Sequence, residues 1–84
     1  MKKITINQLI ETILSLKTKD QMENLLLGIL TPQELEQLPV RLEVVKRLKK
    51  GDPQRKIADD LGVGIATVTR GATEIKKGGF KDVK

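Results

Sequence analysis

Cysteine, histidine, tryptophan and tyrosine are all absent from this chain of 84 residues, and phenylalanine occurs only once. Without cysteine no disulfide can stabilise a small domain, and without cysteine or histidine a zinc site is nearly excluded. Side chains for acid–base or covalent catalysis are equally scarce, because no paired carboxylates stand beside a nucleophile. These absences predict a protein that is not an enzyme and that holds no metal ion.

Long apolar segments are missing as well. No stretch stays apolar for the length that a membrane span requires. The basic start Met1–Lys3 is not followed by the apolar run of a signal peptide, since Glu11 and other polar residues interrupt it. We therefore expect a cytoplasmic protein that does not bind a membrane.

Positive charge is in excess, and it lies in one half of the chain. Residues 1–45 carry five Lys/Arg and six Asp/Glu, whereas residues 46–84 carry eleven Lys/Arg and five Asp/Glu, a net charge of +6. A basic half of this kind is typical of a surface that binds phosphate groups, as in nucleic-acid-binding proteins. The alternative, a surface whose charge only keeps the protein in solution, stays open at this point.

Apolar residues recur at helical spacing along the chain, and no run alternates as a strand would, so we expect an all-α fold in one small domain. The first helical stripe follows an expected capping box of Thr5 and Gln8. The second helix is expected from about Asp20 to Ile29, with Thr18 as its cap. The first stripe consists of Ile6, Leu9, Ile10, Ile13 and Leu14.

The second of these helices is apolar on nearly all its sides. A short chain has little interior in which to bury such a helix, so we expect a second copy of the chain to cover it in a homodimer. A core formed within a single chain is the alternative.

Two further helix starts can be read from the sequence. Thr31-Pro32-Gln33-Glu34 combines a cap, a proline in the first turn and a glutamate that completes a capping box; this helix is expected to end near Pro39. A separate helix is then expected over Val40–Lys50, with Leu42, Val45 and Leu48 facing inward. Asp52 and Pro53 are expected to cap and open the next helix, residues 53–61.

The stretch from residue 55 to residue 71 has the spacing of a helix-turn-helix. Ala58 is small where the second helix must pack closely, Gly62 tolerates a positive φ in the turn, and Val68 faces inward. Ile57, Leu61 and Val63 complete the expected apolar contacts. In this motif the second helix enters the major groove of DNA. A helical hairpin in a protein that does not bind DNA is the alternative.

The second helix of the motif then has an outward face suited to reading DNA. Arginine can bind guanine through two hydrogen bonds, threonine can reach a base edge or a phosphate, and alanine or isoleucine can contact a thymine methyl group. Gln54 and Arg55 begin the preceding helix and are expected to contact phosphates. The adjacent pair Asp59-Asp60 is interpreted as solvated. The outward face comprises Ile65, Ala66, Thr69, Arg70 and Thr73.

Several of these residues also carry a family resemblance. The segments L-T-P-Q-E-L-E-Q-L at Leu30–Leu38 and L-G-V-G-I-A-T-V-T-R-G at Leu61–Gly71, together with Arg41, resemble the bacterial tryptophan repressor family. The resemblance covers about Leu25 to Lys77. It implies an intertwined all-helical homodimer in which an amino acid tilts two helix-turn-helix reading heads towards double-stranded DNA.

The resemblance also implies roles for individual residues. Arg41 and Arg70 match two arginines that hold an indole ring between them, which suits guanidinium planes. Glu74 stands where the family has a serine in the ligand pocket, so a carboxylate can meet the ammonium group of a ligand there. Other pocket positions match Leu30, Thr31, Thr67 and Gly71, the first two from the partner subunit. DNA-facing positions match Gln54, Arg55, Gly64, Ile65, Ala66, Thr69 and Arg70.

The sequence thus predicts a sequence-specific transcriptional repressor that binds a palindromic operator as a homodimer, with L-tryptophan or a related aromatic amino acid as possible co-repressor. Within the single domain, residues 5–50 are expected to form the core and dimerisation helices, residues 53–77 the reading head and residues 78–84 a loose tail. The alternative function is a helical protein-interaction module that has lost DNA reading.

Overall fold

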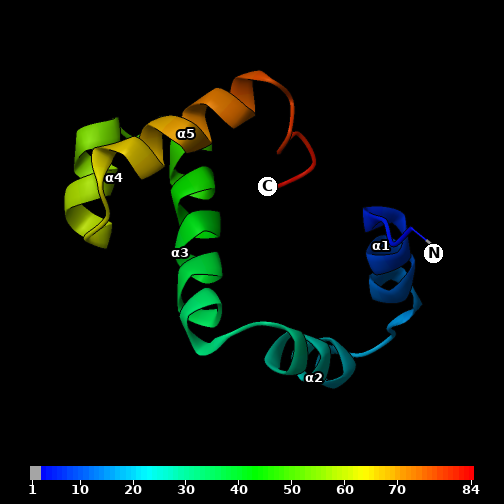
Figure 1. The fold of residues 1–84 in the computed structure, drawn as a ribbon. Coiled ribbons are helices and arrows are strands. Elements are labelled where there is room, and N and C mark those ends of the chain that lie inside the picture. The colour runs from blue at the N-terminus through cyan, green and yellow to red at the C-terminus, as the bar shows by residue number, and fades with distance from the viewer. Residues whose placement is uncertain (1–2) are drawn as a thin grey trace. The chain divides into compact units, whose positions relative to one another are not determined.

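Five α-helices follow one another along residues 3–84, the part of the chain that the computed structural model describes (Figure 1). These residues contain no strand, which confirms the expected all-α class. None of their helices combines the length and apolar character needed to cross a membrane. The helices are α1 (Ile6–Ser15), α2 (Lys19–Ile29), α3 (Pro32–Lys49), α4 (Gln54–Leu61) and α5 (Ile65–Lys76).

The chain divides into two compact units, with the boundary between Leu35 and Glu36. In the first unit, local capping contacts start the helices as the sequence predicts. The backbone N–H of Thr5 donates to Oε1 of Gln8 over 2.7 Å, and Thr18 Oγ1 accepts from the N–H of Gln21 over 3.1 Å. These bonds satisfy donors that a helix start would otherwise leave free.

Neither α1 nor α2 contains a buried residue, although both are rich in large apolar side chains. Leu14 is 77 % exposed and Leu27 is 57 % exposed. Leaving such side chains in water costs free energy that burial against an apolar surface would recover. Within the first unit, the two helices therefore leave these apolar faces uncovered.

The start of α3 is a complete capping box. The N–H of Thr31 donates to Oε1 of Glu34 over 2.8 Å, and the N–H of Glu34 donates to Oγ1 of Thr31 over 3.2 Å. The expected helix end near Pro39 is wrong, because α3 continues through it as far as Lys49. Pro39 is exposed, so water can take the place of the donor that the proline ring lacks.

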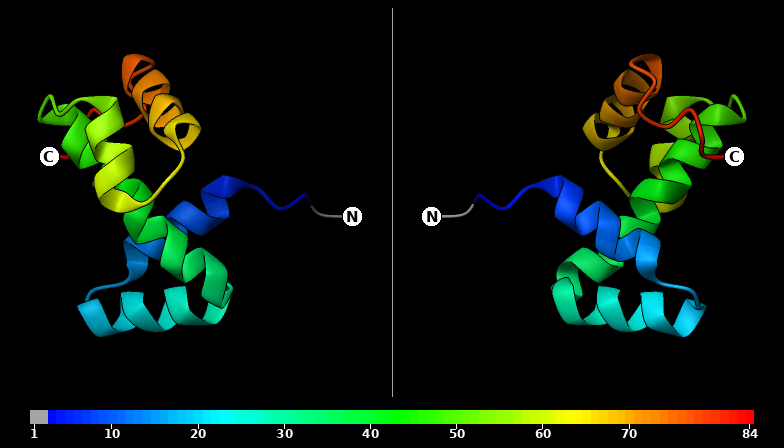
Figure 2. Two further views of the ribbon diagram at one scale, coloured as in Figure 1. Left: turned by 90° about the vertical axis from the view of Figure 1, so that its left-hand side faces the viewer. Right: turned by 90° about the vertical axis from the view of Figure 1, so that its right-hand side faces the viewer.

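The core of the second unit joins α3, α4 and α5, which lie together in both views of Figure 2. Val44 comes from α3, Ile57 and Ala58 from α4, and Val68 from α5; Ile57 and Val68 are both 0 % exposed. Leu48, Leu61 and Val63 pack against this cluster at its margin. The core thus fixes the position of α5 against both α3 and α4.

Leu42 and Asp52 differ in part from what the sequence predicts. Val45 is buried as expected, whereas Leu42 remains 43 % exposed. Asp52 does not cap α4, whose N-cap is Pro53. The carboxylate of Asp52 instead accepts a hydrogen bond from Arg47 over 2.8 Å, which competes with its use as a cap.

The segment after α5 differs from the loose tail that the sequence predicts. It folds into turns in which the N–H of Val83 donates to the carbonyl of Phe80 over 3.1 Å. Lys49 of α3 donates from Nζ to the carbonyl oxygens of Phe80 and Val83. The segment is therefore bound to the end of α3.

Candidate nucleic-acid interface and ligand cavity

The corner between α4 and α5 has the backbone geometry that the motif requires. Gly62 follows α4 in the left-handed conformation, at φ +66°, where an L side chain would be strained. The N–H of Val63 then returns to the carbonyl of Ala58 over 3.1 Å, which closes the end of α4. Gly64 serves as the N-cap of α5.

The predicted apolar contacts of the corner are confirmed. Ile57 and Val68 are fully buried, Ala58 lies beside them, and Leu61 and Val63 pack at the edge of the same cluster. Because Val68 is the one buried residue of α5, its burial also decides which face of α5 points outward.

The outward face of α4 and α5 carries the residues predicted to contact DNA. All of them are exposed except Gln54, which is half-buried. Thr69 Oγ1 donates to Oε1 of Gln54 over 2.9 Å, so the first residue of α4 is bonded to the middle of α5. Thr73 Oγ1 donates back to the carbonyl of Thr69 over 3.1 Å. The set comprises Gln54, Arg55, Gly64, Ile65, Ala66, Thr69, Arg70 and Thr73.

A cavity of about 520 Å³ lies between α3 and α5 within the second unit. Its volume falls in the range of small-molecule sites. Five of the residues predicted to bind a ligand line it together; the other two, Leu30 and Thr31, are not among its lining residues. The five are Arg41, Thr67, Arg70, Gly71 and Glu74.

Close approach of the two helices defines one wall of the cavity. A Cβ atom on Gly71 would lie 3.3 Å from Cδ1 of Leu48 and 3.5 Å from Cγ1 of Val44. The absence of a side chain at Gly71 lets α5 pack directly on α3. Arg70, the preceding residue, both lines the cavity and stands on the outward face of α5.

The sequence reasoning missed half of the cavity lining. Leu38, Leu42, Val44 and Val45 form its apolar part on α3. Their helical spacing is visible in the sequence, but the break expected at Pro39 separated Leu38 from the others. Phe80 also lines the cavity, and only its status as the one aromatic residue marks it in the sequence.

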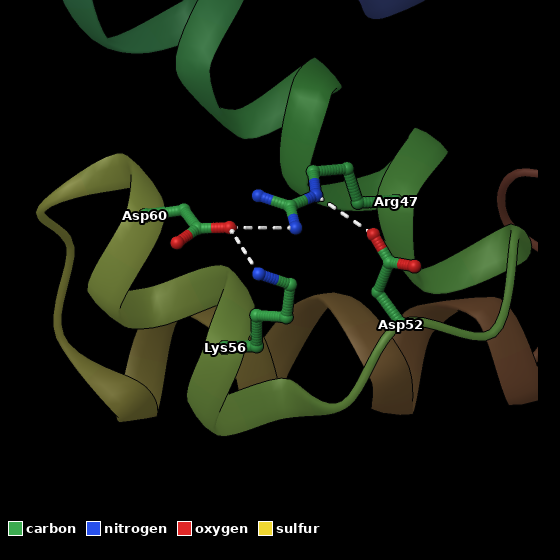
Figure 3. A network of polar contacts seen from close by, with 4 residues as sticks. All are labelled: Arg47, Asp52, Lys56 and Asp60. Carbon is green, nitrogen blue, oxygen red and sulfur yellow. Dashed lines mark hydrogen bonds and ion pairs between the residues drawn. The ribbon is translucent and has the colours of Figure 1, made fainter.

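An ion-pair network, shown in Figure 3, joins α3 to α4 in the second unit. Arg47 donates from Nε to Asp52 over 2.8 Å and from Nη2 to Asp60 over 2.9 Å; Lys56 Nζ lies 3.3 Å from the same oxygen of Asp60. Asp60 is exposed, at 43 % for its side chain, in keeping with the interpretation of this residue as solvated, but it also forms ion pairs that the sequence did not predict. Arg47 and Asp60 lie thirteen residues apart in the chain, so the spacing of residues within one helix could not predict this pair.

The network changes the acidity of its members. The hydrogen bond from Arg47, with a second from Lys56, lowers the pKa of Asp60 below its ordinary value of 3.8. The bonds to Asp52 and then to Asp60 raise the pKa of Arg47. Asp60 is therefore held in its charged form.

Comparisons with known proteins identify a family and several relatives of this chain. The model of the Trp repressor protein family matches residues 4–82. A Trp operon repressor homolog of Vibrio campbellii is 46 % identical over 70 residues, which cover 82 % of this chain and 70 % of that protein. The homolog of Vibrio cholerae is 41 % identical over 70 residues, which cover 82 % of this chain and 68 % of that protein. No solved structure matches significantly.

Proposed function

We infer the function from the family: this chain belongs to the Trp repressor protein family. It is a DNA-binding transcriptional repressor, and the family bears out the prediction that it is not an enzyme. We further propose that it works in the cytoplasm as a homodimer on a palindromic operator, controlled by an aromatic amino acid.

The observation that carries this proposal is the double position of Arg70. Its side chain lies on the exposed face of α5 and at the wall of the cavity between α3 and α5. A ligand in the cavity would thus touch the helix that meets DNA. Control of DNA binding by a ligand requires such a shared element, because the ligand must contact something whose position affects the DNA interface.

For DNA recognition we propose different roles on α4 and α5. Arg70 reads a guanine, and Ile65, Ala66 and Thr69 contact neighbouring bases in the major groove. Gln54 and Arg55 at the start of α4 contact phosphates. Gly64 and Thr73 lie at the edge of the proposed DNA-contacting surface. The hydrogen bond between Thr69 and Gln54 supports this division, since it holds the phosphate-contacting and base-reading helices in register.

For the ligand we propose L-tryptophan. The cavity offers an apolar wall on α3 together with the guanidinium groups of Arg41 and Arg70. Guanidinium planes suit an indole ring, and the carboxylate of Glu74 suits the ammonium group of an amino acid. Leu30 and Thr31 would reach the ligand from the partner subunit. The names of the related proteins, Trp operon repressor homologs, support the same ligand.

The homodimer rests on the apolar faces of α1 and α2. Side chains such as Leu14 and Leu27 are largely exposed in the single chain. A second copy presents the same faces and can cover them by a two-fold arrangement. Two reading heads would then meet half-sites one helical turn apart, about 34 Å.

Fluorescence anisotropy of labelled DNA tests the function. We would titrate the protein against DNA from upstream of its own gene and against random DNA, at two salt concentrations, with and without L-tryptophan. Wild type should bind the upstream DNA more tightly, and tryptophan should tighten this binding. Arg70→Ala should weaken specific binding by about 1–3 kcal/mol and relax discrimination between the two DNAs.

Arg55→Ala is the matched control for a phosphate contact. It should weaken binding to both DNAs alike and reduce the salt dependence. Equal losses on both DNAs for Arg70→Ala would contradict its reading role. Absence of any salt-dependent DNA binding would contradict the repressor and favour a protein-interaction module.

A further inference from the structure

Phe80 is the only aromatic residue of the chain, and it lines the cavity between α3 and α5. It does not belong to either helix but to the turn segment that follows α5. Its side chain is half-buried, although the residues on both sides of it are exposed. The segment thus contributes one apolar ring to the cavity.

Hydrogen bonds to the main chain hold the segment that carries this ring. Lys49 Nζ donates to the carbonyl oxygens of Phe80 and Val83, and the N–H of Gly79 donates to the carbonyl of Glu74 over 3.0 Å. The first contacts tie the segment to α3 and the last ties it to α5. Both helices that form the cavity therefore hold the segment that carries Phe80.

The chemistry of the cavity suits an aromatic ring. Arg41 and Arg70 line it together with the apolar side chains of Leu42 and Val45. Guanidinium planes and aliphatic walls attract the face of any aromatic ring. A ring supplied by the same chain has a high effective concentration at this place, because only a few residues separate it from α5.

We propose that Phe80 is an internal cap of the ligand cavity, and that an aromatic ligand must displace it. This inference rests on the proposed function of the cavity as a ligand site. Displacement breaks the contacts of Lys49 with the segment and frees residues 78–83 from α3. Phe80 and Lys49 then set the threshold concentration at which a ligand is sensed.

The first test locates the ring in the full chain without ligand. Because Phe80 is the sole aromatic residue, every aromatic proton signal in the NMR spectrum belongs to it. We expect nuclear Overhauser contacts from the ring to methyl groups of Leu42 and Val45. Addition of L-tryptophan should remove these contacts. Their absence in the free protein would overturn the proposal.

The second test measures affinity by titration calorimetry, with L-tryptophan as the probe. A cap that is seated in about nine molecules of ten weakens the apparent affinity roughly tenfold, so Phe80→Ala should tighten binding by roughly this factor. Lys49→Met, which leaves the ring but removes its anchor, should tighten binding less. Lys50→Met changes the neighbouring exposed lysine and should leave the affinity unchanged.

Each other result has a definite meaning. Weaker or unchanged binding in Phe80→Ala would show that the ring supports the ligand or is irrelevant to it, and would overturn the cap. Failure of Phe80→Ala to bind tryptophan at all would also overturn it, because removal of the ring should open the cavity. A failure of the repressor function would appear in the DNA titration instead, whatever the NMR contacts show.

Discussion

Arg47 near the end of α3 and Asp60 in the last turn of α4 are hydrogen-bonded over 2.9 Å, from Nη2 to Oδ2. The side chain of Arg47 is 16 % exposed, and its Nε binds Asp52 in the connecting loop at the same time. One guanidinium group thus connects α3, the loop after it and α4. The fork of donors on arginine makes this double contact possible, whereas lysine lacks it.

We expect this network to stabilise the second unit. Arg47→Met should lower the midpoint of urea unfolding more than Asp60→Asn, because it breaks the bonds to both carboxylates. Asp59→Asn is the matched control, since Asp59 is the exposed neighbour and belongs to no ion pair among residues 3–84. A midpoint for Asp60→Asn equal to that of Asp59→Asn would contradict a stabilising role.

The same network should make stability depend on pH. Because Arg47 lowers the pKa of Asp60 below 3.8 in the folded chain, the charged carboxylate favours folding at all pH values above this ordinary value. This contribution is lost as the pH falls from 3.8 through the lowered folded pKa, since the folded state then also binds the proton. Urea unfolding of wild type and Asp60→Asn should therefore differ near neutral pH and converge in acid.

The two glycines at the corner between α4 and α5 should respond differently to substitution. Gly62→Ala places a Cβ atom at φ +66° with no atom within 4 Å, so its cost is backbone strain rather than collision, about 1 kcal/mol. Gly64→Ser retains the allowed φ of −69° and adds a capping side chain, so the free energy of unfolding should not fall. Equal losses for both variants in urea unfolding would refute this explanation.

Exposed apolar residues of the first unit should control the oligomeric state. In analytical ultracentrifugation wild type should sediment at twice the 9.4 kDa mass of one chain. Leu27→Asp should shift the population towards the monomer, because it would place a charge in the apolar interface. Asn24→Asp adds the same charge at an exposed polar position of α2 and should remain dimeric. A monomeric wild type would contradict the homodimer.

Predictions from neighbouring residues succeeded where the interaction itself is local. The capping box of Thr31 and Glu34 depends on residues three apart, and the structure contains both of its bonds. The left-handed turn at Gly62 likewise needs only the glycine and the helix before it. The packing of α4 against α5 was predictable because the corner and the core residues Ile57 and Val68 lie within about a dozen residues.

Predictions failed where a contact with a residue distant in the chain outweighs the local preference. Asp52 can cap a helix by local rules, but Arg47 takes its carboxylate. Pro39 weakens a helix locally, yet α3 continues past it into a segment whose Val44 and Val45 are buried. Packing of α3 against α4 and α5 stabilises the helix beyond the proline. The free energy of this packing cannot be read from the residues next to Pro39.

The sequence by itself determined an all-helical chain, a basic half and the glycine corner between α4 and α5, because helix periodicity, caps and turns depend on short spacings. It also marked Arg41, Arg70 and Glu74 through the family resemblance. Only the tertiary structure decided that these three line one cavity and that Phe80 joins them. It alone paired Arg47 with Asp60. Contacts between residues far apart in the chain depend on how helices pack, and that packing is the combined result of many side chains.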